Sequence, residues 1–408
     1  MASAAIVKGE RDLLADAIGP STASTAAAWR HGGKLPEVES LRGLAILLVV
    51  LFHLHAMVGR HSFATPADTS LAGAFVLAGH TGVSLFFVLS GFLLAGPFLA
   101  EAAGGARVAR RAYAARRVLR VMPAYVAAVT VASIDCATRP LEVLRGVPYL
   151  FFLESIPGMT TPLIPYSDVW WTLATEAQFY LTLPLLAWAW RAGPRLVGLL
   201  AVTYALAYTA VVTGAIGTGT PGGTLALTGS LFGRGPLFAL GAAAAWLLPT
   251  AAARSKAWAG RSSWAGGGAA DVVLLILLVG LALLLRRVVA ASYLTAELGW
   301  PWWHVIEGAL WASLLLLLLV APLRSKPLLC NAVLARLGLW SYSLYLLHFP
   351  LIWYVFDRRH GTLGPVLDAS GVPPAIRPGL VLAVSIVLAA LSYQVIERPF
   401  LRRKAILR

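Results

Sequence analysis

Arg42 and His53 are the two side chains whose types and spacing best suit chemistry. Both lie in one apolar run, residues 41–59, and they are eleven positions apart. On an α-helix this spacing returns to within about 20° of the same face and rises about 16 Å. Because a guanidinium binds phosphate and an imidazole takes up protons near neutral pH, the spacing predicts one stripe with an anion-binding end and a deep general base. His55 falls on the opposite side, and we expect no role for it.

Each of these residues could also have a purely structural role, and this explanation is stronger for some of them than for others. An arginine at the entrance of a membrane span is often an anchor that reaches the lipid headgroups. A histidine inside a span is costly unless it is paired, so His53 indicates a functional site. Glu176 is a second ionisable side chain in an apolar run, with Tyr180 four residues later on the same helical face. Either a structural ion pair or a site explains a carboxylate at this depth.

Arginines gather between the second and third apolar runs. Fourteen positions contain six of them, Arg107, Arg110, Arg111, Arg116, Arg117 and Arg120. Such a cluster is typical of a cytoplasmic loop that fixes membrane topology or of a helix lying on anionic lipid, and it is also suited to binding phosphate groups. Both interpretations remain open, because the same loop would lie beside the membrane entrance that Arg42 marks.

The composition predicts an all-α polytopic membrane protein. Hydrophobic residues make up 59% of the 408 residues and charged residues only 12%. The net charge of +15 does not indicate nucleic-acid binding, because the cations lie between apolar segments. We expect both termini in the cytoplasm, Trp300, Trp302 and Trp303 at the outer interface, and about ten transmembrane helices. The predicted spans are residues 41–59, 73–99, 123–137, 168–186, 196–213, 225–248, 271–285, 304–322, 333–356 and 379–395.

The predicted domain organisation is simple. Residues 1–36 contain charged residues and no hydrophobic region of a signal peptide, so we expect a mobile cytosolic tail there. Residues 37–398 form the transmembrane domain, and residues 399–408 form a basic cytoplasmic tail. Cys136 and Cys330 should lie near opposite membrane faces, which argues against a disulfide. No metal-ligand spacing is present, and we expect no metal.

Several motifs in this order resemble the acyltransferase family 3 of membrane O-acyltransferases. They are the Arg42 and His53 pair and the runs 82–92, 116–125, 171–180, 341–348 and 397–400. The resemblance implies transfer of an acyl group, commonly acetyl, from cytoplasmic acyl-CoA to a hydroxyl of a glycan or other acceptor. Two positions depart from the family pattern: Ser84 and Ala177 stand where an acidic residue is common. Each departure removes a carboxylate that would orient the base or the acceptor.

Together the residues and the resemblance predict a site. The predicted catalytic residues are His53, Glu176 and Arg42; the predicted acyl-CoA contacts are Arg42, Arg116, Arg117 and Arg120; the predicted substrate contacts are Ser84, Ser90, Trp171, Tyr180, Tyr345 and His348. In the leading hypothesis the arginines bind the phosphates of acyl-CoA and His53 deprotonates the acceptor hydroxyl. Glu176 or Tyr345 would orient the imidazole. An acyl-histidine intermediate is an open variant.

The identity of the acceptor is open. A cell-envelope glycan or a lipid-linked sugar is the first expectation, in a bacterial cytoplasmic membrane, and a secreted small molecule such as a macrolide is the alternative. A secondary transporter or lipid exporter is a different class that also buries charges in a membrane. A scaffold without catalysis is a third. Membrane lipids are expected partners, and the sequence does not predict the oligomeric state.

Overall fold

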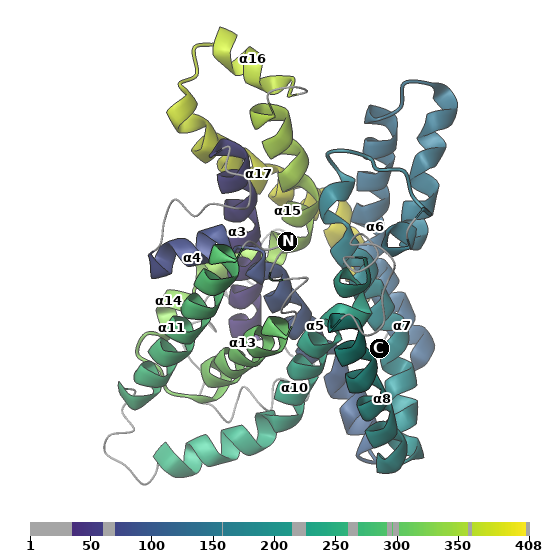
Figure 1. Cartoon of the computed structure of the whole chain (residues 1–408), viewed down its shortest axis with the longest axis vertical. Coiled ribbons are helices and arrows are strands. Elements are labelled where there is room, and N and C mark those ends of the chain that lie inside the picture. Colours follow the sequence, from purple (N-terminus) through teal and green to yellow (C-terminus); the bar gives the residue numbers. More distant parts are fainter. Residues whose placement is uncertain are drawn as a thin grey trace, which may run out of the picture.

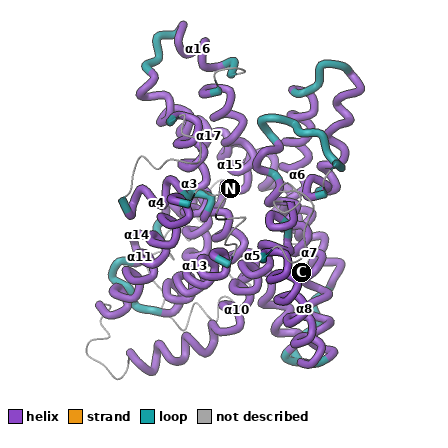
Figure 2. The backbone as a smooth tube through the Cα atoms, in the orientation of Figure 1, coloured by secondary structure: helices purple, strands orange, loops and turns teal. Residues whose placement is uncertain are grey.

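The computed structural model is helical throughout the part of the chain that it describes (Figures 1 and 2). No β-strand occurs among those residues, so the predicted all-α class is confirmed. They are residues 35–59, 70–156, 158–213, 226–259, 268–291, 296, 302–357 and 361–404. Of the predicted N-terminal tail, residues 1–34 lie outside this part, as do Trp300 and the last four residues of the predicted C-terminal tail.

The longer helices follow the predicted apolar runs. They are α3 (Pro36–Val58), α5 (Thr81–Ala102), α6 (Arg110–Asp135), α7 (Trp171–Ala192), α8 (Pro194–Val212), α10 (Leu231–Ala259), α11 (Gly268–Ala290), α13 (Trp303–Val320), α15 (Ala332–Phe356) and α17 (Arg377–Ser392). Shorter elements connect or extend them. They are α4 (Leu71–Leu77), η2 (Pro140–Phe151), η3 (Leu153–Ser155), η4 (Ser167–Val169), α14 (Lys326–Leu329), α16 (Leu363–Ala369), η6 (Pro374–Ile376), η7 (Tyr393–Glu397) and α18 (Arg398–Lys404).

Seven of the described helices are long and apolar enough to cross a membrane. The chain is therefore a multi-pass membrane protein, whereas the count of ten and the cytoplasmic termini stay predictions. The other three predicted spans coincide with α7, α8 and α15. α8 is short, and α7 and α15 carry polar side chains such as Glu176 and His348 that lower their hydropathy. The residues that suggest a site are thus the ones that weaken the membrane signal.

Two predicted span boundaries are wrong. The second span, expected over residues 73–99, is broken between α4 and α5, where Ala78 leaves the helical conformation at φ −109° and ψ 31°. The third span, expected to open at Pro123, begins at Arg110, so that the proline lies inside α6. Arginine is a good helix former, and the basic stretch therefore continues the helix instead of forming a loop.

Close contact between α3 and α15 aligns the two helices that carry the main site residues. A Cβ atom at Gly43 would lie 1.9 Å from the carbonyl oxygen of Leu334, and one at Gly338 would lie 1.9 Å from that of Glu39. Only glycine permits such an approach, as at other membrane helix interfaces. The two helices run side by side in Figure 1 and make extensive contact along their length.

A second group of packed helices consists of α5, α10 and α13. α5 approaches the α10 backbone closely at Gly91, where a Cβ atom would lie 2.1 Å from the carbonyl oxygen of Phe238. Phe238 is buried there between Phe87 and Phe179, with ring centroids 4.8 and 4.2 Å away. Gly91 therefore serves helix packing.

Candidate functional site

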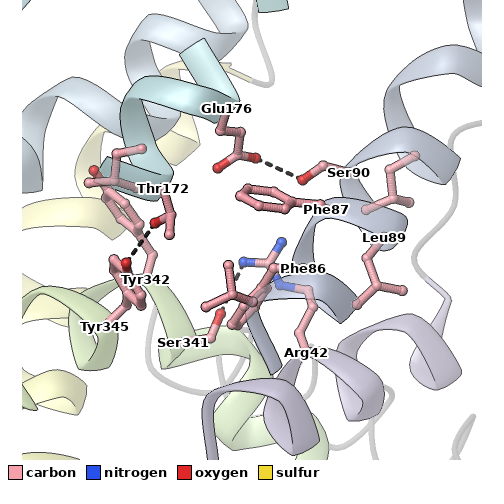
Figure 3. Close-up of a pocket in the computed structure, with 13 residues that line it drawn as sticks. Arg42, Phe86, Phe87, Leu89, Ser90, Thr172, Glu176, Ser341, Tyr342 and Tyr345 are labelled. Atoms are coloured by element: carbon pink, nitrogen blue, oxygen red, sulfur yellow. Dashed lines mark hydrogen bonds between the residues drawn. The ribbon is translucent and has the colours of Figure 1, made fainter. Parts of the chain in front are cut away.

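A pocket opens between α3, α5, α7 and α15 (Figure 3). Its volume is about 70 Å³. That space holds a few water-sized groups. Its lining combines apolar side chains, mostly from α5, with polar side chains from all four helices, among them Arg42, Ser90, Thr172, Glu176, Ser341 and Tyr345.

Arg42 and Glu176 face the pocket without pairing with each other. Arg42 Nη2 donates to Ser341 Oγ at 3.0 Å, and Ser90 Oγ donates to Glu176 Oε1 at 2.7 Å (Figure 3). Arg42 Nε is buried, has no hydrogen-bond partner among the described residues, and lies 3.7 Å from Glu39 Oε2. The guanidinium therefore keeps donor capacity toward the pocket.

Tyr345 closes one side of the pocket through contacts within the protein. Its hydroxyl lies 2.6 Å from Thr172 Oγ1 and also contacts the carbonyl oxygen of Val169. The carbonyl can only accept, so the Tyr345 hydroxyl donates to Val169 and accepts from Thr172. The sequence-based proposal that Tyr345 orients His53 therefore has no contact in the structure to support it.

His53 is instead paired with His348. His348 Nδ1 lies 2.9 Å from the carbonyl oxygen of Tyr345 and 3.1 Å from that of Leu344, and so it carries the hydrogen and donates. His348 Nε2, left as an acceptor, lies 3.1 Å from His53 Nδ1. His53 Nδ1 also lies 2.9 Å from the carbonyl oxygen of Val49. Two acceptors therefore fix the hydrogen of His53 on Nδ1.

This arrangement leaves His53 Nε2 as the basic nitrogen of a neutral imidazole. The described part of the chain provides no hydrogen bond to it. Phe52 and Phe349 surround the ring edge-on, with centroids 5.1 and 4.9 Å away. His53 is half-buried. His53 is thus a neutral imidazole fixed in one orientation with the lone pair of Nε2 free, which is the form that a general base requires.

The prediction that Arg42 and His53 share one face of a helix is confirmed, because both contact α15, at Ser341 and His348 respectively. The pocket ends at Tyr345 and does not include His53 or His348. Tyr345 and His348 lie on successive positions of one helical face, with ring centroids 5.9 Å apart. The pocket thus ends about one helical turn short of the histidine pair.

The basic residues of α6 differ in their partners. Arg120 Nη1 lies 3.1 Å from Glu397 Oε2, which makes Arg120 part of a buried ion pair. Arg117 lies over the ring of Tyr180 at 5.8 Å, and no described carboxylate pairs with it. Its Nε is buried without a hydrogen-bond partner. Arg116 is half-buried on the same helix. Arg117 is therefore a predicted acyl-CoA contact whose positive charge is available to a ligand.

Two predicted substrate contacts lie away from the pocket. Ser84 is buried in α5 and does not line it. Trp171 begins α7 beside the lining residue Thr172, and its ring lies 5.6 Å beneath the guanidinium of Arg234. The structure therefore brings Arg42, Ser90, Glu176 and Tyr345 together, and leaves Ser84 and Trp171 outside.

A buried polar network on α5, α10 and α13 was not predicted. Arg234 Nη1 donates to His304 Nε2, and His304 Nδ1 donates to Glu307 Oε2 at 3.2 Å. From the other side Thr81 Oγ1 donates to Glu307 Oε1. Trp311 Nε1 donates to Thr81 at 2.9 Å. The signal in the sequence was Arg234, a cation inside an apolar run.

Trp303 belongs with this network and not with the membrane surface. It was expected at the outer interface together with Trp302. The structure buries Trp303 completely against His304, with ring centroids 3.7 Å apart, and leaves Trp302 37% exposed. The buried network beneath it gives the indole a protein surface to cover. Among the described residues, no group of three His, Cys, Asp or Glu side chains is placed to hold a metal ion.

A family model and one known protein match this sequence over most of its length. The sequence model of a family described as an acyltransferase domain matches residues 35–394. The chain is also 28% identical over 385 residues to acyltransferase MdmB of Streptomyces mycarofaciens. That match covers 90% of this chain and 92% of the relative.

Two further relatives match over shorter stretches. Peptidoglycan O-acetyltransferase OatA of Listeria monocytogenes is 28% identical over 179 residues, which is 40% of this chain and 26% of the relative. Nodulation protein 10 of Rhizobium leguminosarum bv. viciae is 30% identical over 145 residues, 31% of this chain and 38% of the relative. No solved structure matches the chain. Because the family match spans nearly the whole helical bundle, the chain belongs to the acyltransferase 3 family of membrane acyltransferases.

Proposed function

We propose that the protein transfers an acyl group, most simply acetyl, from acyl-CoA to an acceptor hydroxyl, with His53 as the general base. The observation that carries this proposal is the contact of His53 Nδ1 with His348 and Val49, which leaves Nε2 basic. The match to a peptidoglycan O-acetyltransferase supports both the acetyl group and an oxygen acceptor. A half-buried imidazole held in one tautomer is a suitable base near neutral pH.

The proposed reaction is a direct transfer. Nε2 of His53 removes the hydroxyl proton while the acceptor oxygen attacks the thioester carbonyl. The carbon–oxygen bond forms, the carbon–sulfur bond breaks, and the imidazolium returns its proton to the departing thiolate of CoA. His348 and Val49 hold the ring throughout, so His348 is a positioning residue. In the two-step variant the same nitrogen carries the acyl group before the acceptor arrives.

The donor is proposed to enter from the α6 side of the pocket. Arg117 supplies a cation that no described carboxylate neutralises, and Arg116 lies beside it on the helix. Arg42 offers a second cation inside the pocket. Phosphate groups favour such arginines, and the narrow pocket suits the slender arm of CoA rather than its nucleotide. Arg120 is assigned to helix packing through Glu397 instead of to the donor.

Glu176 is proposed to act on the substrate and not on His53. Its Oε1 accepts from Ser90, and its side chain lines the same pocket as Arg42 and Tyr345. A carboxylate there orients a hydroxyl or amide group of a bound substrate through a charge-assisted hydrogen bond. Tyr180 supports this end of the site by its contact with Arg117.

The proposed acceptor is a cell-envelope glycan or a lipid-linked sugar, with a secreted small molecule such as a macrolide as the alternative. The proposed location is a bacterial cytoplasmic membrane with both termini inside and with membrane lipids as partners. The partial match to a peptidoglycan O-acetyltransferase favours the glycan.

The test is release of free thiol from acetyl-CoA by the purified protein, with and without an extract of envelope glycans. Wild type and His55→Ala should show acceptor-dependent release, and His53→Ala should not. His55 serves as the matched control because it lies on the same helix, two residues further on. Stoichiometric acyl labelling of His53 without acceptor would replace the direct route by the two-step route. If the folded protein neither binds acetyl-CoA nor releases thiol, the proposal of an enzyme is overturned and a transporter is favoured.

A further inference from the structure

The pocket contains two opposite charges that are not paired with each other. Arg42 on α3 and Glu176 on α7 are the only charged side chains among the described residues that line it. They come from different helices, and both point into the same space (Figure 3). Glu176 acts electrostatically on Arg42, yet the ion pair that Arg42 forms, at 3.7 Å, is with Glu39, one turn earlier on α3. Opposite charges that face one small space attract each other, so something must hold them apart.

A serine on a third helix holds the carboxylate. Ser90 on α5 donates from Oγ to Glu176 Oε1 at 2.7 Å. A hydroxyl has one hydrogen to donate and no net charge, so it satisfies a carboxylate oxygen without neutralising it. The hydrogen bond therefore sets where the carboxylate of Glu176 lies but does not cancel its attraction for Arg42.

A serine on α15 holds the guanidinium. Arg42 Nη2 donates to Ser341 Oγ at 3.0 Å, and Ser341 is buried. The close contact of α3 and α15 brings these two side chains together. Gly43, where the two backbones approach each other, directly follows Arg42. Gly338 precedes Ser341 by three residues, on the same helical face. The hydroxyl of Ser341 accepts from the cation without neutralising it, as Ser90 donates to the anion.

The rest of the lining has little to offer these two charges. Most of the other side chains there are apolar. The hydroxyl groups of Tyr342 and Tyr345 already donate to the carbonyl oxygens of Val121 and Val169. Without its serine, either charged group would therefore find its strongest replacement partner in the opposite charge of the same pocket. A pocket of about 70 Å³ does not hold both an ion pair and a ligand.

We propose that two serines, Ser90 and Ser341, are positioning residues that hold the opposite charges of the pocket apart and so keep it open for the pantetheine arm of acyl-CoA. The inference rests on the proposed function, which supplies this occupant. Held apart, the carboxylate of Glu176 accepts from an N–H of the arm, and the guanidinium of Arg42 donates to one of its carbonyl oxygens. Paired with each other, the two groups would fill the pocket. The two serines thus determine whether these charges bind the donor or each other.

The test is a pair of double-mutant cycles in which calorimetry measures the binding of CoA to the purified protein in detergent. Ser341→Ala should weaken CoA binding about tenfold, the effect of losing a hydrogen bond to a charged group. In a Glu176→Gln background the same change should weaken binding less than about twofold, because the freed Arg42 then has no carboxylate in the pocket to pair with. Ser341 and Glu176 make no contact with each other in the described part of the chain, so a direct contact does not explain such coupling.

The second cycle uses the other serine. Ser90→Ala should also weaken CoA binding about tenfold, and in an Arg42→Gln background it should weaken binding less than about twofold. Ser90→Thr keeps the hydroxyl and should bind CoA as wild type does. Ser84→Ala is the matched control, because Ser84 is a buried serine of α5 that does not line the pocket. Adenosine 3′,5′-bisphosphate, which is the nucleotide part of CoA without the arm, should bind wild type and the serine variants equally.

Each outcome decides the proposal. Equal losses of affinity in the two backgrounds of either cycle would overturn it, because the serine would then contact the ligand or serve packing alone. So would wild-type affinity in both alanine variants, or binding by Ser90→Thr as weak as that by Ser90→Ala. The two serines lie on different helices, so one cycle remains if a variant of the other does not fold. Failure of wild type to bind CoA would contradict the proposed function and this inference with it, whereas the outcomes above contradict the inference alone.

Discussion

The protein buries two groups of arginine, histidine and glutamate residues in its helices, and they differ in how their hydrogen bonds are used. In the network on α5, α10 and α13, Glu307 accepts from His304 on one side and from Thr81 on the other. Both ends of its carboxylate are satisfied by the protein itself. His304 uses both ring nitrogens in the same way, toward Arg234 and Glu307.

The group around the pocket is open by comparison. His53 uses only one ring nitrogen for protein contacts, and Arg42 Nε has no hydrogen-bond partner in the described part of the chain. Residue types are nearly the same in the two groups. What separates a packing network from a reaction site is therefore the balance of donors and acceptors, because a satisfied group has nothing left to offer a substrate.

Replacing the two histidines tests this comparison most strongly. His53→Ala should lower the acyl-transfer rate by about 10²–10⁴, the usual contribution of a general base, and leave thermal unfolding close to wild type. His304→Ala should do the reverse and lower the unfolding temperature while the folded fraction keeps its specific activity. The measurements are thiol release and thermal unfolding in the same detergent. If His304→Ala is stable but inactive, the buried network on α5, α10 and α13 takes part in the reaction.

Glu307→Ala should have the largest effect on stability. It removes the acceptor from two buried donors, Thr81 and His304, at a cost of about 1–3 kcal/mol each. Thermal unfolding or yield of folded protein reports this loss. Glu142→Ala is the control, because its ion pair with Arg145 is at the surface, where solvent screens the two charges. Unfolding temperatures that agree between the two variants would show that the network carries no stability.

Some of this contrast could be predicted from the sequence. The period of an α-helix is local, so the spacing of Arg42 and His53 was enough to place them on one face, and apolar runs were enough to locate the helices. The partner of His53 could not be found in this way, because His348 lies 295 residues further along the chain. Their meeting depends on the register of α3 against α15, which the close contact at Gly43 and Gly338 sets.

The closed network was missed for the same reason. Thr81, Arg234 and Glu307 lie on three helices, and no pattern within one helix indicates that they meet. Position in the sequence reveals which faces are polar, whereas packing decides which polar groups find each other.

Arg117 and Arg120, which both lie on α6, allow a smaller version of the same comparison. Arg117→Ala should raise the KM for acyl-CoA by about tenfold to a hundredfold, the loss of charge-assisted hydrogen bonds to phosphate. Arg120→Ala should leave this KM unchanged and lower the unfolding temperature, because it leaves Glu397 buried without its partner. Initial rates at varied acetyl-CoA and thermal unfolding separate the two. An equal rise of KM in both variants would make the Glu397 pair part of the donor site.

His348 should show the smallest effect, because its role is to hold His53 and not to react. His348→Leu removes an acceptor from His53 Nδ1, but the carbonyl oxygen of Val49 remains 2.9 Å away. Loss of one neutral hydrogen bond of about 0.5–1.5 kcal/mol corresponds to a two- to tenfold lower kcat, with KM for both substrates unchanged. His348→Gln keeps an oxygen acceptor on a side chain of similar length and should restore most of the rate. If Gln is as slow as Leu, or if KM rises together with the fall in kcat, His348 contacts the substrate directly, and the open group contains two reacting histidines instead of one.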